Sequence, residues 1–324
     1  LLLIAILYIA VEYKKQFGVY SFNINDLKNL VLSPSESLLV FCGFMLAFGI
    51  KIPIFPFHTW LSDTYRSSPT GIVVVMSALM AKLGVYAIWR FLFTLFPETS
   101  QMIAPYFIGI GLFGLIYFGI SAMSQTHLKR MFAFSSASHL SLIVVGFFIY
   151  NTYGLIGSSY LIVAHALSSA ALFLMLGMMF ERTKTYNINK LGGIARVAPR
   201  FSLFFAFFVL SIVGIPSTSG FVAELLIIVG AFEYDIVVGF LSAITILIAM
   251  LFMFKVISKV LYGEQSKSTL EFNDLRIHEL MALIPLALLI LCMGIFPNFF
   301  IQKIEPTASF CTKEVCITDV GGLK

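Results

Sequence analysis

Long apolar stretches, separated by short polar loops, recur along this 324-residue chain and limit its fold more than any other feature. An α-helix needs about 20 predominantly apolar residues to cross the hydrocarbon core of a bilayer. After an apolar opening segment we expect eight spans, at roughly residues 38–60, 71–96, 104–124, 131–150, 154–180, 201–232, 236–262 and 280–302. The sequence therefore predicts an all-α, polytopic transmembrane helical bundle.

The composition excludes a water-facing domain. The chain is 59% hydrophobic and only 11% charged, whereas soluble domains carry about 25% charged residues. The longest polar stretches, 181–200 and 263–279, are no longer than loops, so no soluble domain is inserted. We find no glycine-rich phosphate loop, no C-x2-C iron–sulfur spacing and no nucleotide-binding strand–helix unit.

The two ends of the chain differ from the apolar middle, residues 11–302. The opening LLLIAILYIA, residues 1–10, is too short for a full span and no charged region precedes it as in a signal peptide. We interpret it as the end of a truncated transmembrane helix, and the chain as a fragment or one half of a split protein. In the polar tail, 303–324, Cys311 and Cys316 are spaced as C-x4-C. That spacing alone is weak evidence for a metal site, and both a disulfide and two free thiols stay open.

Lysine and arginine alternate between the loops in a way that supports these spans. Loops at 61–70, 125–130, 181–200 and 255–279 hold twelve of them, and the segments expected on the other side hold seven. Loops rich in basic residues face the cytoplasm or the matrix. We read these residues as signals of topology and not as a nucleic-acid patch. The remaining two basic residues, Lys51 and Lys82, lie inside spans.

Two spans contain helix-breaking residues. The first holds Lys51-Ile-Pro53-Ile-Phe-Pro56, and the span 201–232 holds Gly214-Ile-Pro216-Ser-Thr-Ser-Gly220. As one helix, 201–232 would be about 48 Å long, too long for a core of about 30 Å. Broken helices at matching places in two halves indicate an inverted-repeat transporter. The two breaks lie five spans apart, an odd offset that gives opposite topology and fits two five-helix repeats.

Ionisable residues lie at the depth of the membrane in five of these spans. A charge at the bilayer centre costs about 2.5–3.5 kcal/mol even on a lenient scale, and chains that keep one use it for ion or proton routes. Lys82 is mid-span, too deep to reach the interface by snorkelling. Lys51 and Glu224 flank the two breaks; Lys51 has either a relay or pairing role or a bond to carbonyls freed by the break.

Three histidines complete the candidate proton path. His139 and His165 lie at mid-depth on consecutive helices, each among serines, and suggest a hydrated polar track. Histidine gives and takes a proton near neutral pH, although a lone buried histidine is more often a structural hydrogen-bonder. His58, nearer the inner end of its span, is a candidate for proton uptake or for a helix cap. None of them has the neighbours of a metal site.

Five ordered segments carry a family resemblance: GIKIPIFPFHTWLSDTYRSSPT, ALMAKLGVYAIWRF, HLKRMFAFSSASHLSLIVVGFF, IVAHALSSAALFLMLGMMFERT and GIPSTSGFVAELLIIVGAF. In them the chain resembles the antiporter-like membrane subunits of respiratory complex I, from about residue 40 to 262. Within that family the acid Glu224 resembles the subunit 4, or M-type, branch, because subunits 2 and 5 generally carry lysine there. The resemblance implies an inverted-repeat fold with two broken helices.

The resemblance also implies roles for six residues. Lys51, Lys82, His139, His165 and Glu224 match the family's proton relay, and His58 matches a histidine near its input side. The family pairs the lysine at Lys51 with a glutamate on an earlier helix that this chain lacks. A second chain or a further segment would supply that partner.

The expected function is therefore proton translocation in the membrane arm of NADH:ubiquinone oxidoreductase. We expect no cofactor in this chain, with NADH, FMN, iron–sulfur clusters and ubiquinone bound by partner subunits. Expected partners are subunit 2-like and subunit 5-like neighbours and phospholipids, and the expected location is the mitochondrial inner membrane or a bacterial plasma membrane. Two alternatives stay open: a subunit of an Mrp-type sodium/proton antiporter, and a structural subunit with an inactive relay.

Overall fold

The computed structural model describes residues 1–319, with side chains from residue 1 to 308, so Cys311 and Cys316 lie outside the described side chains. Sixteen α-helical segments, two π-helical segments and two 3₁₀ turns follow one another: α1 (Leu2–Phe17), α2 (Ile24–Leu27), α3 (Pro34–Lys51), α4 (Thr59–Ser67), α5 (Thr70–Val75), η1 (Met76–Met80), α6 (Ala81–Ala87), η2 (Ile88–Leu92), α7 (Phe93–Leu95), α8 (Pro97–Ser124), α9 (Leu128–Phe148), α10 (Thr152–Thr183), η3 (Ile188–Lys190), α11 (Ile194–Val197), α12 (Pro199–Val213), α13 (Ser219–Tyr234), α14 (Ile236–Val260), η4 (Lys267–Thr269), α15 (Ile277–Ile295) and α16 (Pro297–Asp319).

Seven helices in the described part of the chain are long and apolar enough to cross a membrane. One of them is the continuous run from α5 to α7, which counts as a single span of 26 residues. The others are α3, α8, α9, α10, α14 and α15. The prediction of an all-α, polytopic membrane bundle is confirmed.

Both predicted breaks are present. The first helix ends with α3 at Lys51, and α4 begins at Thr59 after a turn that contains a cis peptide bond between Phe55 and Pro56. The second ends with α12 at Val213 and resumes with α13 after Gly214, which has a left-handed φ of 75°. Glycine takes this conformation without the steric cost that a Cβ would impose. The fold therefore has the two broken helices that the prolines and glycines predict.

The structure differs from the expected boundaries at the start of α8, which begins at Pro97 and not at residue 104, and at both ends of the chain. The opening helix is longer than the segment 1–10, since α1 continues to Phe17, where Gly18 ends it in a left-handed conformation. The expected span 280–302 is divided: α15 ends at Ile295, and Pro297 takes the first turn of a new helix, α16. Proline suits that position because its fixed φ is helical and its missing N–H has no partner there anyway. The segment 303–319 therefore belongs to a helix.

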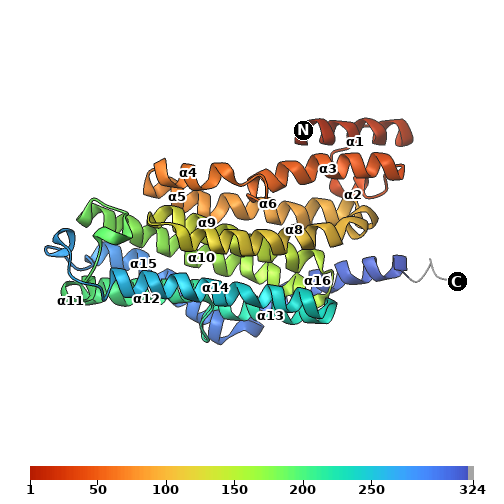
Figure 1. The fold of residues 1–324 in the computed structure, drawn as a ribbon. Coiled ribbons are helices and arrows are strands. Elements are labelled where there is room, and N and C mark those ends of the chain that lie inside the picture. The colour runs from red at the N-terminus through yellow and green to blue at the C-terminus, as the bar shows by residue number, and fades with distance from the viewer. Residues whose placement is uncertain (320–324) are drawn as a thin grey trace.

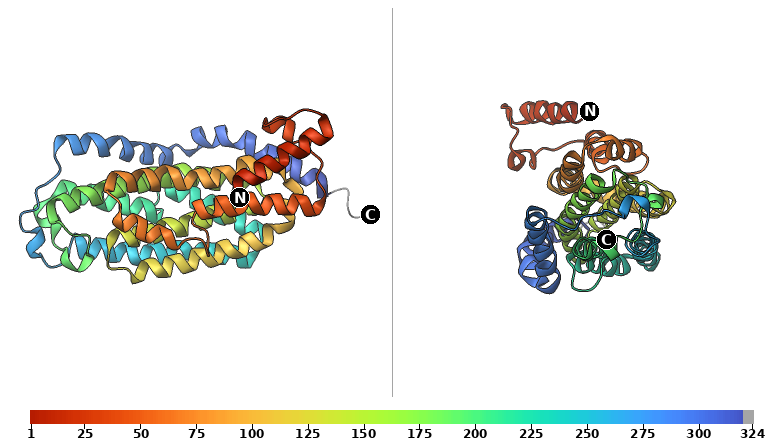
Figure 2. Two further views of the ribbon diagram at one scale, coloured as in Figure 1. Left: turned by 90° about the horizontal axis from the view of Figure 1, so that it is seen from above. Right: turned by 90° about the vertical axis from the view of Figure 1, so that its left-hand side faces the viewer.

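Helices α9 and α10 form the centre of the bundle, and the others surround them (Figures 1 and 2). Within the apolar stretch of α9, 94% of the residues are buried inside the protein, against 22% for α15. Helix α1 lies at the edge of the bundle, where it packs on α3 and Tyr8 donates a hydrogen bond of 2.8 Å to Glu36. Any functional side chain on α9 is thus shielded from lipid.

Candidate functional site

Lys82 lies on α6, a short α-helical segment between the two π-helical segments η1 and η2, and its side chain is buried. In η1 the Ala81 N–H bonds to the carbonyl of Met76, five residues back. In a regular α-helix that N–H would bond to the Ser77 carbonyl instead. The Ser77 carbonyl accepts a hydrogen bond from Lys82 Nζ. The π-turn thus gives the buried lysine an acceptor, in keeping with the frequent occurrence of π-turns at functional sites.

His165, on α10, is the next group in line. Its Nδ1 lies 2.9 Å from Lys82 Nζ, and the two residues are buried together between α6 and α10. Its Nε2 has no hydrogen-bond partner among the described residues. The His165 ring lies 5.2 Å from the ring of His139, measured between centroids. His165 therefore links the lysine on α6 to the histidine on α9.

His139 has three oxygen neighbours. Its Nδ1 lies 2.9 Å from the Ser135 carbonyl oxygen on its own helix. Its Nε2 lies 3.1 Å from the Ile212 carbonyl oxygen of α12 and 3.2 Å from Glu224 Oε1 of α13. Both side chains of the His139–Glu224 pair are almost fully buried. The two carbonyls satisfy the ring nitrogens of His139, whereas Glu224 Oε1 has no hydrogen-bond partner among the described residues.

The backbone at the second break positions Glu224. Gly214 has a left-handed φ of 75°, which favours glycine, and a Cβ placed on it would lie 2.8 Å from Glu224 Oε2, so the backbone of the break lies directly against the carboxylate. The carboxylate is thus held between the turn at Gly214 and the ring of His139.

A small cavity of about 10 Å³ lies between α9, α10, α12 and α13. It is lined by both histidines, Ser168, Ser211 and Glu224, among others. This volume is at the lower limit of the space that one water molecule needs, and the surface of the cavity is apolar. The cavity therefore marks where the two histidines and Glu224 come together, and it has no room for a continuous file of water.

The hydrated track that the serines suggest stays a prediction, because few of these hydroxyl groups reach the cavity. Ser168 lines the cavity and shares a hydrogen bond of 2.7 Å with Ser211 of α12. Ser138 donates to the Leu115 carbonyl of α8, and Ser169 donates within its own helix. These last two hydroxyls serve helix packing, as polar residues in membrane interfaces often do.

Lys51 does not join this group. It is the last residue of α3, its side chain is exposed, and it has no hydrogen-bond or ion-pair partner in the part of the chain that the structure describes. One interpretation of the sequence expected Lys51 to donate hydrogen bonds to carbonyls freed by the break, and the structure does not show such bonds. The end of α3 nevertheless packs tightly on α6, since a Cβ on Gly84 would lie 2.6 Å from Cγ1 of Ile52.

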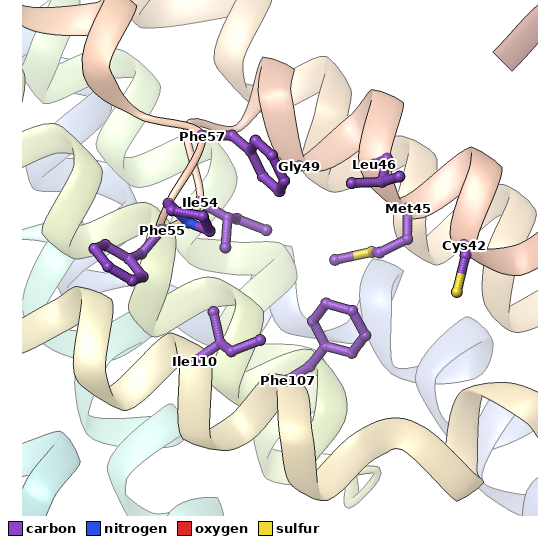
Figure 3. Close-up of a pocket in the computed structure, with 10 residues that line it drawn as sticks. Cys42, Met45, Leu46, Gly49, Ile54, Phe55, Phe57, Phe107 and Ile110 are labelled. Carbon is purple, nitrogen blue, oxygen red and sulfur yellow. The ribbon is translucent and has the colours of Figure 1, made fainter. Parts of the chain in front are cut away.

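An apolar cavity of about 290 Å³ lies beside the first break (Figure 3). Met45 and Ile54 from the broken helix point into it from one side, and Phe107 and Ile110 from α8 point into it from the other. Its lining holds no carboxylate, histidine or lysine, and Cys42 is the one titratable side chain in it, so this break differs in character from the second.

His58 is buried at the N-cap of α4 and sits apart from the other two histidines, in contact with three aromatic rings, Phe55, Tyr117 and Phe118. Its side chain makes no capping hydrogen bond, and its Nδ1 has no partner among the described residues. A role in proton uptake stays a prediction, and the cap by its side chain is not observed.

The structure thus brings together four of the six residues that the sequence singles out: Lys82, His165, His139 and Glu224. Sequence reasoning missed two backbone acceptors, the carbonyls of Ser77 and Ile212. The free carbonyl of Ile212 could have been predicted from the sequence, because Pro216 follows Ile212 by four residues and cannot donate the helical hydrogen bond. No group of three or more histidine, cysteine, aspartate or glutamate side chains in the described residues is arranged to hold a metal ion.

Comparison with known proteins places this arrangement in a family. The family model described as NADH:quinone oxidoreductase/Mrp antiporter, TM matches residues 1–249. NADH-quinone oxidoreductase subunit M of Rickettsia prowazekii (strain Madrid E) is 34% identical over 299 residues, which is 91% of this chain and 60% of the relative. NADH-ubiquinone oxidoreductase chain 4 of Chondrus crispus is 32% identical over 274 residues, 84% of this chain and 56% of the relative. The chain thus spans less than two thirds of the length of these relatives.

Two solved structures share the fold. Respiratory complex I from Thermus thermophilus with bound NADH contains a chain that superposes with a TM-score of 0.89 at 27% identity, over 97% of this chain and 67% of that one. The Mrp complex from Dietzia sp. DQ12-45-1b gives a TM-score of 0.84 at 20% identity, over 99% of this chain and 68% of that one. The second likeness concerns the fold alone.

Proposed function

Because this chain belongs to the family of NADH:quinone oxidoreductase and Mrp antiporter membrane subunits, we propose that it is a proton-translocating subunit of the membrane arm of an NADH:quinone oxidoreductase. The branch is that of subunit M and chain 4, the names that its relatives carry. The observation that carries the proposal is the buried line Lys82–His165–His139–Glu224, which runs across four helices.

The geometry suits proton transfer along this line. A proton can pass from Lys82 Nζ to His165 Nδ1 across a 2.9 Å contact. His139 and Glu224 exchange a proton across a 3.2 Å contact. At an effective dielectric constant of about 20, a unit charge about 5 Å away changes the energy of a neighbouring charge by about 3 kcal/mol. Each proton that moves therefore changes the proton affinity of the next group by about a hundredfold.

The redox chemistry belongs to partner subunits in this proposal. NADH, FMN, iron–sulfur clusters and ubiquinone would be bound there, and quinone reduction would drive the charge shift that reaches Lys82. The neighbours would be subunit 2-like and subunit 5-like proteins together with phospholipids. The membrane would be the mitochondrial inner membrane or a bacterial plasma membrane.

Lys51 enters the proposal through a partner outside this chain. Its exposed ammonium group would pair with a carboxylate from a further transmembrane segment, supplied by a second chain or by more of this one. The tight contact of α3 with α6 at Gly84 brings that pair close to the helix that carries Lys82. His58, with an unpartnered ring nitrogen, is proposed as a proton uptake group.

The test is a Lys82→Ala variant in the native assembly, purified in a gentle detergent and reconstituted into vesicles. We expect normal assembly and quinone reduction with loss of proton pumping by this subunit. Full pumping in an assembled variant would refute the role and favour a structural subunit. Mass spectrometry of the assembly identifies its partners: flavin and quinone-reducing subunits support the proposal, and a small set of antiporter subunits without NADH oxidation would support the Mrp-type alternative.

A further inference from the structure

His139 and His165 differ in the number of hydrogen-bond acceptors around their rings. Both ring nitrogens of His139 face an acceptor, and the Nε2 of His165 faces none among the described residues. We infer that His139 is held as a doubly protonated imidazolium, and that Pro216 makes this so by freeing the carbonyl of Ile212. The order of proton transfer that follows from this inference rests on the proposed relay. The protonation state itself can be tested without any pumping assay.

Both ring nitrogens of His139 face backbone oxygens. Nδ1 lies 2.9 Å from the Ser135 carbonyl and Nε2 lies 3.1 Å from the Ile212 carbonyl. A neutral imidazole has one N–H, so one of its nitrogens would direct a lone pair at a carbonyl lone pair. Only the imidazolium donates at both nitrogens. Glu224 Oε1, 3.2 Å from Nε2, adds the compensating negative charge.

The Ile212 carbonyl is available because of the break. In a continuous helix it would accept a hydrogen bond from residue 216, but Pro216 has no N–H to donate. The preceding carbonyl, Ser211, also loses its helical donor, since the N–H of Ile215 bonds to the Leu210 carbonyl at 3.3 Å. A carbonyl freed at membrane depth must be satisfied by protein or water. His139 Nε2 satisfies the Ile212 carbonyl.

His165 lacks such acceptors. Only its Nδ1 has a hydrogen-bond partner, the Nζ of Lys82, and its Nε2 has none among the described residues. One N–H is enough for that environment, so a neutral ring fits it. The ionisable groups that face His139 are Glu224 from α13 and His165 from α10, with Lys82 of α6 behind His165. The only negative charge among them belongs to Glu224.

This assignment sets the order of proton transfer. An imidazolium cannot accept a proton, so His139 must first give its Nε2 proton to the Glu224 carboxylate, which leaves a neutral ring and a carboxylic acid. A proton that arrives from Lys82 by way of His165 then restores the imidazolium. Release therefore precedes uptake at His139.

The experiment is nitrogen-15 solid-state NMR of histidine-labelled native assembly in lipid, near pH 7. The wild-type spectrum minus that of His139→Gln isolates the two ring nitrogens of His139. We expect both at protonated positions, and the same subtraction with His165→Gln is expected to give one protonated and one bare nitrogen. A bare nitrogen in the His139 difference spectrum would overturn the inference, whether or not Lys82→Ala abolishes pumping.

Pro216→Ala tests the cause. It restores an N–H four residues after Ile212, and we expect His139 to lose its imidazolium signals at the same pH. Pro285→Ala is the matched control, because Pro285 lies inside α15 and forms no hydrogen bond with any of these groups. Retention of the imidazolium in assembled Pro216→Ala would refute the role of the proline. If that variant does not assemble, the wild-type spectrum still decides the protonation state.

Discussion

The two broken helices of this chain treat their charged residues in opposite ways. At the second break, Glu224 is buried, faces His139, and lies against a backbone that only glycine at position 214 permits. At the first break, Lys51 is exposed, lacks a partner among the described residues, and sits near an apolar cavity. The same arrangement in the sequence, a proline-interrupted span with a charge beside it, thus produces one charge that faces a partner and one that has none among the described residues.

The difference shows what a broken helix needs in order to hold a charge. A break frees carbonyl groups and brings a charge to membrane depth, but both must then find partners. The second break lies against α9 and α10, which supply His139 and the serine hydroxyls. The first lies at the edge of the bundle, against the aromatic and aliphatic side chains of α8 (Figure 3). Neighbouring helices, and not the break itself, decide whether the charge is paired.

Among substitutions at the two breaks, we expect Glu224→Gln to have the largest effect on stability and on proton pumping. Removing one member of a buried ion pair costs about 3–5 kcal/mol of stability, and the relay loses its terminal acceptor. We expect a drop in the midpoint of thermal unfolding in detergent and loss of proton pumping. Glu233→Gln on the exposed side of the same helix is the control and is expected to change neither. Equal behaviour of the two variants would contradict the site.

Gly214→Ala is expected to have the next largest effect. A left-handed alanine costs roughly 1–2 kcal/mol, and its Cβ would also press on Glu224 Oε2. Gly18→Ala separates the two contributions, because Gly18 has a φ of 80° with no atom near its Cβ position. We expect both variants to lose stability and only Gly214→Ala to reduce pumping. A pumping defect in Gly18→Ala would show that strain alone is enough.

Gly84→Ala tests the contact between the first break and the relay helix. Overpacking costs about 1–3 kcal/mol, here through the Ile52 side chain and the Phe48 carbonyl, 3.2 Å from the added Cβ. Gly109→Ala in α8 is the control, because its Cβ meets no atom within 4 Å. We expect a lower unfolding midpoint for Gly84→Ala and an unchanged or higher one for the control. An unaffected Gly84→Ala variant would mean that α3 can move away from α6 at little cost.

The smallest effect on the stability of this chain is expected from Lys51→Met. A side chain without a partner contributes little, so we expect a change within about 0.5 kcal/mol for the chain by itself in detergent. In the full assembly we expect a clear loss of stability and of pumping, because the partner carboxylate is then left unpaired. A large loss in the chain alone would show that Lys51 is paired within it and would end the contrast between the two breaks.

Much of the fold follows from local chemistry. Apolar stretches set the spans, and Pro53, Pro56, Gly214 and Pro216 set the breaks because they remove a donor or allow a left-handed turn. The end of α15 at Ile295 could also have been predicted from the sequence, since Pro297 is a favourable first residue of a new helix. The boundary at Ile295 was missed because hydropathy continues across Pro297, whereas α1 and α8 extend into polar residues that hydropathy leaves out.

The site was less accessible to sequence reasoning. Depth along the spans selected Lys82, His139, His165 and Glu224, and the structure places these four in contact. The coincidence of a charge with a helix break also selected Lys51, because neither depth nor a break reports which way a side chain faces. Helix packing decides that, as it decides which serines reach the cavity. The π-turn at Ser77 could not be predicted from the sequence. Its hydrogen bonds shift by one residue, and no proline or glycine in the segment signals the shift.

Helix α9 is surrounded by α8, α10, α13 and α14 over nearly its whole length. It therefore has almost no contact with the surrounding lipid. Changes in bilayer thickness or lipid charge act on outer helices such as α15, while the His139 carried by α9 keeps the same surroundings. The surroundings of His139 are therefore set by protein, and we expect them to be insensitive to the composition of the bilayer.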